Sequence, residues 1–146
     1  MKFLLIDMSE KDQIHLALFG EEKLFSKNYS GQNRELLLCI DNLLQVKKTK
    51  KEDICGIMVV VGVGSFTSTR IACVVANTFA FVLNIPLLAI KVVDVDKIQT
   101  LIPKLLKQIK GHYISATYSG EPNIGGVGLS RAKRVRNERV KSRDLS

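Results

Sequence analysis

The chain has 146 residues and a mass of 16.3 kDa, which is the length of one ordinary domain and too short for two. Hydrophobic residues make up 46% and charged residues 25%, a balance that excludes disordered and fibrous proteins. No stretch approaches the roughly 18 apolar residues of a membrane span, and the apolar run at 3–6 is too short for a signal-peptide core. We therefore expect a cytoplasmic protein with no membrane partner.

The net charge of +8 is concentrated toward the C-terminus. Residues 1–130 contain 15 basic and 12 acidic residues, a net +3, whereas residues 131–146 contain 7 basic and 2 acidic residues, a net +5. A basic tail is either a solvated extension or a contact to nucleic-acid phosphates. The tail residues that could contact RNA are Arg131, Lys133, Arg134, Arg136 and Arg139.

The three cysteines, Cys39, Cys55 and Cys73, form no CxxC pair and lie among apolar neighbours. This pattern predicts buried free thiols rather than disulfides. Only His15 and His112 could join them as ligands, so we expect no metal site.

The first thirty residues predict three strands joined by short turns. Residues 1–7 are apolar, residues 14–19 alternate with period two, and residues 23–29 follow a glycine turn. Connections this short imply an antiparallel meander.

Residues 33–46 have the period of a helix, with Ser30 or Asn33 as its expected N-cap. The apolar residues of this helix cover an arc of roughly 180°, which is wider than one sheet face requires. The lysines in 47–51 are most simply a solvated helix end that complements the dipole. The arc consists of Leu36, Leu37, Cys39, Ile40, Leu43, Leu44 and Val46.

Residues 54–61 are β-branched and apolar on both faces, which predicts a central strand. A second helix is expected over 67–83, ended by Asn84 and Pro86, and a fifth strand over 87–92.

A third helix should begin near Asp94 as its N-cap and kink or restart at Pro103, and residues 112–118 could form a last strand. The whole order indicates an α/β fold, a mixed five-stranded sheet with flanking helices.

The second helix carries the strongest signal for function. Its polar residues Arg70, Asn77 and Asn84 lie seven apart on one line, and nearly everything else is apolar. A helix that is apolar almost all round must be covered almost all round. Either the first two helices pack on each other over the sheet, or they expose a common apolar face that binds a partner. The residues expected to bind that partner are Leu36, Ile40, Leu43, Ile71, Val74, Val75, Thr78, Phe79 and Val82.

No catalytic, cofactor or metal site can be assembled from the residues. A Rossmann fingerprint that starts at Gly62 and Gly64 would need glycine where Thr67 stands. Asp7 ends the first strand where a functional carboxylate is often found, yet the turn at 9–12 contains no glycine that could bring backbone amides onto a phosphate. A turn-forming aspartate is the better interpretation.

The segment Gly-Val-Gly-Ser-Phe-Thr-Ser-Thr-Arg-Ile at 62–71 resembles the G-P-G-S-F-T-G-L-R-I-G signature of the TsaB (YeaZ) family. The opening Leu-Leu-Ile-Asp-Met-Ser at 4–9 and the Asn-Ile-Pro-Leu at 84–87 are also similar to that family. The motif residues are Gly62, Gly64, Ser65, Phe66, Thr67 and Arg70.

The resemblance implies an actin/Hsp70-like (ASKHA) domain whose nucleotide site has degenerated. TsaB proteins are non-catalytic partners of TsaD, the transferase that makes N6-threonylcarbamoyladenosine at adenosine 37 of tRNA. The family uses its first two helices to form a helical bundle with TsaD or with itself, and also meets the ATPase TsaE. A TsaD-like subunit, a TsaE-like ATPase, a homodimer and tRNA are therefore the expected partners. The alternatives are a minimal ASKHA-type nucleotide-binding or kinase-like protein and a basic-tailed RNA-binding adaptor.

Typical TsaB proteins carry a second domain, whereas only about 50 residues follow the fifth strand here. We therefore expect residues 1–118 to form a single ASKHA-like domain. Residues 119–146 would then be a closing segment and the basic tail, with the second domain absent.

Overall fold

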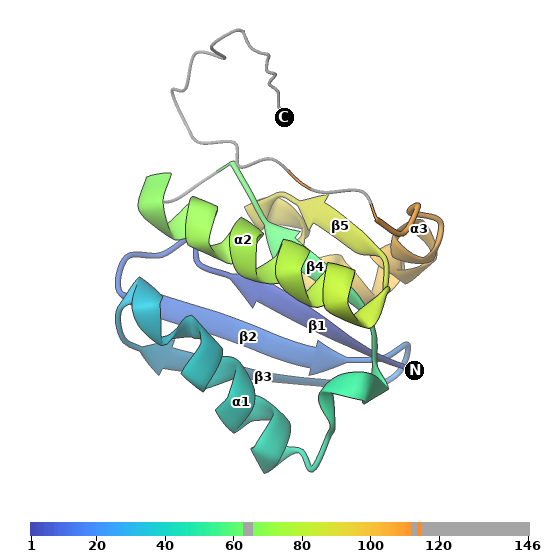
Figure 1. Ribbon diagram of the computed structural model, residues 1–146, viewed down its shortest axis with the longest axis horizontal. Helices are drawn as coiled ribbons and strands as arrows, with labels where there is room; N and C mark the ends of the chain where they lie inside the picture. Colours follow the sequence, from blue (N-terminus) through green and yellow to red (C-terminus); the bar gives the residue numbers. More distant parts are fainter. Residues whose placement is uncertain (63–65, 112–113, 115–146) are drawn as a thin grey trace, which may run out of the picture.

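One mixed sheet of five strands forms the centre of the protein (Figure 1). The computed structural model describes residues 1–62, 66–111 and 114. The strand order is β3-β2-β1-β4-β5, in which β1, β2 and β3 are antiparallel, while β4 is parallel to both β1 and β5. The strands are β1 (Lys2–Asp7), β2 (Gln13–Phe19), β3 (Leu24–Ser30), β4 (Ile54–Val60) and β5 (Leu87–Ile90).

The strand register confirms the antiparallel meander and the central strand that the sequence predicts. Leu4 pairs with Leu18, and Leu18 pairs in turn with Phe25 across β3. On its other side, Leu4 lies beside Ile57 of the parallel strand β4. Both central strands have helices on each face, which is why β1 and β4 are almost uninterrupted apolar runs.

Helices cover both faces of the sheet (Figure 1). Strands β1, β4 and β5 alternate between two cores, so Leu4 and Ile6 pack toward α1 and α2, whereas Phe3 and Leu5 pack toward η3 and α3. The helical elements are η1 (Asn33–Glu35), α1 (Leu36–Val46), η2 (Lys51–Asp53), α2 (Phe66–Leu83), η3 (Val92–Leu101) and α3 (Ile102–Leu106).

The start of the first helix differs from the prediction. Neither Ser30 nor Asn33 is its N-cap, because the chain first makes the 3-10 turn η1, whose N-cap is Gln32. The Glu35 carboxylate accepts the backbone N–H of Gln32 at 3.0 Å. An acidic side chain thus reaches back to the free amide at the start of the turn, as in a capping box.

The start of the third helix also differs from the prediction. Its N-cap is Lys91 and not Asp94, whose carboxylate accepts the Lys91 backbone N–H at 3.2 Å. The segment is a 3-10 helix up to Leu101, and the α-helix begins afresh with Pro103 in its first turn, as the sequence indicates. The strand expected over 112–118 lies outside the described residues, apart from Ile114.

The end of α2 matches the prediction. Asn84 follows the last helical residue with φ of +54°, a left-handed conformation that asparagine tolerates. The next amide, of Ile85, donates back to the carbonyl of Ala80 at 3.0 Å. Pro86 then directs the chain into β5.

All three cysteines are free thiols as predicted, but only Cys73 is buried, whereas Cys39 and Cys55 are half-buried. Burial raises the pKa of Cys39 and Cys73. None of the helices in the described part of the chain has the length and apolar character that a membrane crossing requires.

One side chain of η3 holds the turn between β2 and β3. The Gln99 amide nitrogen lies 2.9, 3.3 and 3.4 Å from the carbonyl oxygens of Gly20, Glu21 and Lys23. Gln99→Met keeps the length of the side chain but removes the donor, so we expect the free energy of unfolding to fall by about 1 kcal/mol in urea denaturation. Gln108→Met is the control, because the hydrogen bond found for the Gln108 amide in the described part of the chain goes to the Lys104 carbonyl, in the preceding turn of the same segment. An equal loss in both variants would contradict this role of Gln99.

Candidate interaction surface

Helix α2 packs on the sheet through small side chains. Ala72, Ala76 and Ala80 are buried against β1, β4 and β5, and Cys73 is buried beside them in the sequence. Because these side chains are short, the helix axis lies close to the sheet and the larger side chains are left on the outer half of the helix. Three of these outer side chains are strongly exposed: Val74 at 61%, Phe81 at 65% and Val82 at 70%.

The side of α2 that faces α1 is intermediate in solvent exposure. Ile71, Val75 and Phe79 are half-buried and touch the core beneath the two helices. The Ser68 hydroxyl donates to the Asn33 side-chain oxygen at 2.8 Å, which joins the first turn of α2 to η1. This side of α2 is therefore fixed relative to α1 while part of its apolar area stays accessible.

Helix α1 requires a correction. Leu36, Ile40 and Leu43, which were expected to bind a partner, are 0–1% exposed and fill the core over β1 and β2. The exposed apolar side chains of α1 are instead Leu37, Leu38 and Val46, none of which is among the residues expected to bind a partner. Their positions next to the buried stripe could have identified them once the inward direction was known.

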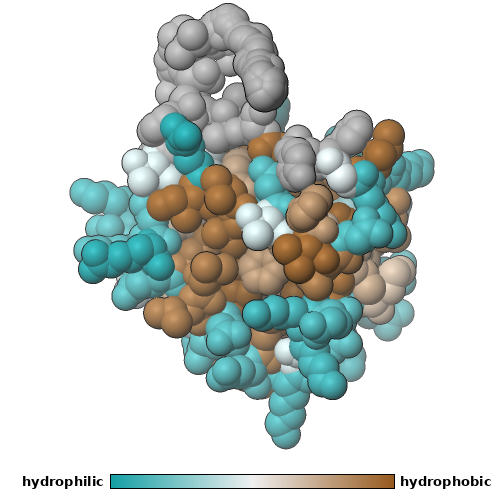
Figure 2. Space-filling model, in the orientation of Figure 1, coloured by the Kyte–Doolittle hydropathy of each residue, from teal (hydrophilic) through white to brown (hydrophobic). Residues whose placement is uncertain are grey.

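The outward apolar side chains of the two helices form one surface. In Figure 2, hydrophobic side chains gather over α1, α2 and the area between them, with polar side chains around the edge. The two helices thus cover the sheet together and also expose apolar side chains. We call this surface the apolar face. Its members are Leu37, Leu38, Ile71, Val74, Val75, Phe79, Phe81 and Val82.

The polar contribution to the apolar face is small. Thr78 is exposed, but its hydroxyl donates to the Val74 carbonyl at 2.8 Å and is satisfied inside the helix. A hollow of ≈ 390 Å³ beside the first turns of α2 is lined by Thr67, Arg70, Ile71, Val74 and Val75. The hollow presents mostly aliphatic surface with a single cation at its edge, and an apolar partner side chain would suit it.

One motif residue at the start of α2, Thr67, lies at a cavity of ≈ 620 Å³. Thr67 and Ser68 line it together with the turn at 9–12 and residues 32–34. Gly62 has φ of +88°, a backbone conformation that favours glycine. Gly64 and Ser65 lie outside the described residues, and Phe66 opens the helix.

Asp7 is held as the sequence analysis expected of a turn residue. One carboxylate oxygen accepts the Ser9 backbone N–H at 3.0 Å and the Ser9 hydroxyl at 2.6 Å, and the other lies 3.4 Å from Nδ1 of His15. The carboxylate thus stands between the hydroxyl and the imidazole. A serine nucleophile requires the opposite order, with the imidazole next to the hydroxyl. Within the described residues no group of three His, Cys, Asp or Glu side chains could hold a metal ion.

These contacts lower the pKa of the Asp7 carboxyl and so link the stability of the fold to pH. Burial raises its pKa, but the hydrogen bonds from His15 and Ser9 outweigh burial and leave the pKa below its ordinary value. The folded state therefore gains stability above about pH 4, and this gain is lost as pH falls through the lowered pKa. We expect Ser9→Ala to raise the pKa of Asp7 in an NMR titration and to move acid unfolding to higher pH. Ser26→Ala, on an exposed part of β3, is the control; an Asp7 pKa unchanged by Ser9→Ala would contradict this account.

Asn77 explains one of the polar positions on α2. Its side chain donates to the Ile114 carbonyl at 3.0 Å and accepts the Ile114 N–H at 2.9 Å. The amide thereby fixes the chain after α3 against α2. The basic tail residues, Arg131 to Arg139, lie outside the described residues.

Comparison with known proteins shows which family and which solved structures the chain is similar to. A family model described as TsaD, tRNA N6-adenosine threonylcarbamoyltransferase, matches residues 28–104. Among solved structures, YeaZ from Pseudomonas aeruginosa is similar, with a TM-score of 0.57 and 28% identity over 62% of this chain and 43% of that chain. A protein described as uncharacterized, with similarity to peptidase YeaZ from Pseudomonas aeruginosa, gives the same TM-score of 0.57, 28% identity and 62% and 43% coverage. The chain thus spans 43% of the length of each structure. A search of curated proteins finds no match.

Proposed function

The chain is a YeaZ-like (TsaB-like) member of the family of the tRNA N6-adenosine threonylcarbamoyltransferase TsaD, and from this premise we propose that it is a non-catalytic subunit of the assembly that makes N6-threonylcarbamoyladenosine in tRNA. Its sheet and helices have the actin/Hsp70-like fold of that family. We propose that residues 1–118 form one such domain. In this role the chain binds a TsaD-like transferase and supports its activity in the cytoplasm.

The observation that carries the proposal is the apolar face of α1 and α2. Val74, Phe81 and Val82 are exposed on a helix whose opposite side is fully engaged with the sheet. Burying such side chains against a partner removes apolar area from water at roughly 25 cal/mol per Å². A helical bundle formed with two helices of a TsaD-like chain, or with those of a second copy, would cover the face.

The decisive experiment mixes the full chain with the TsaD-like subunit of the same organism. We expect the two proteins to co-elute in size-exclusion chromatography, and we expect threonylcarbamoyl transfer to tRNA to increase when the chain is added. A TsaE-like ATPase is a further partner that the same experiment can include. The proposal fails if the transferase neither binds the chain nor responds to it.

The enzymatic alternative, a minimal kinase-like protein, predicts ATP binding. We expect the chain alone to bind no ATP at micromolar concentration and to hydrolyse none. The turn at 9–12 contains no glycine, and the Asp7 carboxylate is already bonded to Ser9 and faces His15. Isothermal titration calorimetry with ATP and magnesium tests this expectation, and micromolar binding would favour the enzymatic alternative.

The basic tail is proposed as a contact to tRNA through Arg131, Lys133, Arg134, Arg136 and Arg139. Each phosphate that such a residue neutralises adds roughly 0.7 to 0.9 to the magnitude of the slope of log affinity against log salt. Comparing that slope with and without residues 131–146 tests the proposal, and identical slopes would contradict it.

A further inference from the structure

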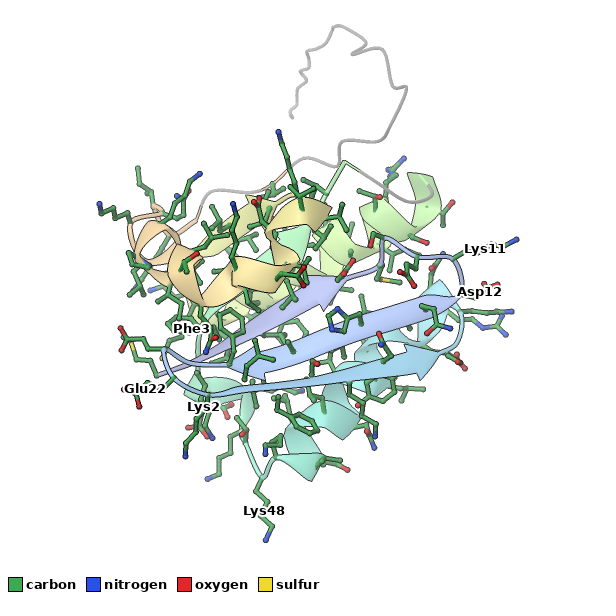
Figure 3. All side chains as sticks on the ribbon, turned by 180° about the vertical axis from the view of Figure 1, so that it is seen from behind. Lys2, Phe3, Lys11, Asp12, Glu22 and Lys48 are labelled. Carbon is green, nitrogen blue, oxygen red and sulfur yellow. The ribbon has the colours of Figure 1, made fainter. Side chains whose placement is uncertain are left out.

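Lysines gather around the C-terminal end of α1. Figure 3 shows Lys2 and Glu22 at one end of the sheet, Lys11 and Asp12 at the other, and Lys48 projecting from the loop that follows α1. Two lysines from the sheet lie beside this loop and α1. Lys2 of β1 donates a hydrogen bond to Thr49 in the loop, and Lys27 of β3 donates one to Asn42 of α1. We call this group the lysine cluster. Its members are Lys2, Lys27, Lys47, Lys48, Lys50 and Lys51.

Three of these lysines are held in place by neutral groups. The Lys47 ammonium lies 4.6 Å from the centre of the Phe25 ring. The Lys27 ammonium lies 5.0 Å from the Tyr29 ring centre and donates to the side-chain oxygen of Asn42 at 3.3 Å.

Lys2 completes the set by donating from its ammonium to the Thr49 hydroxyl at 3.0 Å. Both side-chain ion pairs found among the described residues lie elsewhere, between His15 and Asp7 and between Lys97 and Asp94. Among the described residues, the held lysines therefore form no ion pair with a carboxylate, although Glu21 and Glu22 line the same hollow as Lys2 and Lys47.

The dipole of α1 accounts for only part of this charge. A helix C-terminus carries about half a negative charge, and its effect falls off within the last turn. Lys47 and Lys48 follow that turn, but Lys2 and Lys27 come from strands. The nearby carboxylate of Asp53 accepts the backbone N–H of Lys50 at 3.0 Å, and so serves the turn η2.

We propose that the lysine cluster binds the phosphate backbone of tRNA. The inference rests on the proposed function, because that function selects RNA among the polyanions that a lysine cluster could bind. The ten residue steps from Leu37 to Lys47 span about 15 Å along α1, so most of the cluster lies toward the end of α1 that is far from Leu37. The chain can then hold its protein partner with one part of α1 and touch RNA with the other.

The test removes three charges from the cluster and three from elsewhere. The triple variant Lys2→Gln, Lys27→Gln, Lys47→Gln is compared with the control Lys104→Gln, Lys107→Gln, Lys110→Gln on the other face of the sheet. Both are full chains with the tail intact and have the same net charge. Binding of an unmodified tRNA transcript is measured at several salt concentrations, and association with the TsaD-like subunit is measured separately.

We expect the cluster variant to lose at least tenfold in tRNA affinity and its salt slope to flatten by about 2 to 3, with little change in the control. Binding to the TsaD-like subunit should be unchanged in both, so a failure of the proposed function would be seen independently. If the cluster variant unfolds, Lys48→Gln, Lys50→Gln, Lys51→Gln replaces it, since no ion pair or ring contact of these three side chains is found among the described residues. Equal losses in the cluster and control variants would overturn the inference. An unchanged tRNA affinity of the cluster variant would also overturn it. Binding to anionic phosphatidylserine vesicles is measured in parallel, and a variant that loses vesicle binding but keeps tRNA binding would overturn it too.

Discussion

Replacing Val74 by glutamate is expected to abolish the association of the chain with a TsaD-like subunit, or with itself, while the fold stays intact. Val74 is 61% exposed at the centre of the apolar face, and glutamate is a better helix former than valine. An unpaired carboxylate buried in a contact costs several kcal/mol. Since each 1.4 kcal/mol changes affinity tenfold, the dissociation constant should rise by more than about 100-fold in analytical ultracentrifugation.

The matched control for this variant is Val93→Glu. Val93 is 74% exposed on η3, which covers the other face of the sheet, so the same change of charge occurs away from the apolar face. We expect Val93→Glu to associate like the wild type and both variants to keep the wild-type circular dichroism spectrum. If Val74→Glu also associates like the wild type, the apolar face is not the contact.

The fold was largely predictable because its signals are local. The alternation in 14–19 and the continuous apolar run at 1–7 identify β2 and β1, and Asn84 before Pro86 marks the end of α2. The helix starts were less predictable. Whether Asp94 caps the segment or reaches back from its third position depends on the backbone angles of Lys91, which hydrophobic periodicity does not encode.

The sequence predicts the exposed apolar side chains correctly at Val74 and Val82 of α2 and wrongly on α1, and the reason is physical. The sequence predicts binding for the most regular apolar stripe of α1, which contains Leu36, Ile40 and Leu43, but these residues are buried in the core. A protein core and a protein interface are both rich in large apolar side chains, so the residue types alone do not separate them. On α2 the inward side is made of alanines, so the larger residues Val74 and Val82 remained for the outside. Periodicity gives the width of an apolar arc but not the direction in which it faces.

Leu43 and Leu38 of α1 allow a test of which leucines stabilise the core and which contact a partner. Leu43 is fully buried at 0% exposure, whereas Leu38 is 71% exposed at the edge of the apolar face. Leu43→Ala leaves a cavity in the core and should lower the free energy of unfolding by about 2–5 kcal/mol.

Leu38→Ala makes the same chemical change at the surface, so its stability should stay within about 0.5 kcal/mol of the wild type. Its association with the TsaD-like subunit should weaken, because a contact loses apolar area that the folded chain alone never buried. Urea denaturation and sedimentation of the two variants measure both quantities. If Leu43→Ala weakened association without loss of stability, the core assignment of α1 would be wrong and the sequence-based choice of Leu43 as a binding residue would stand.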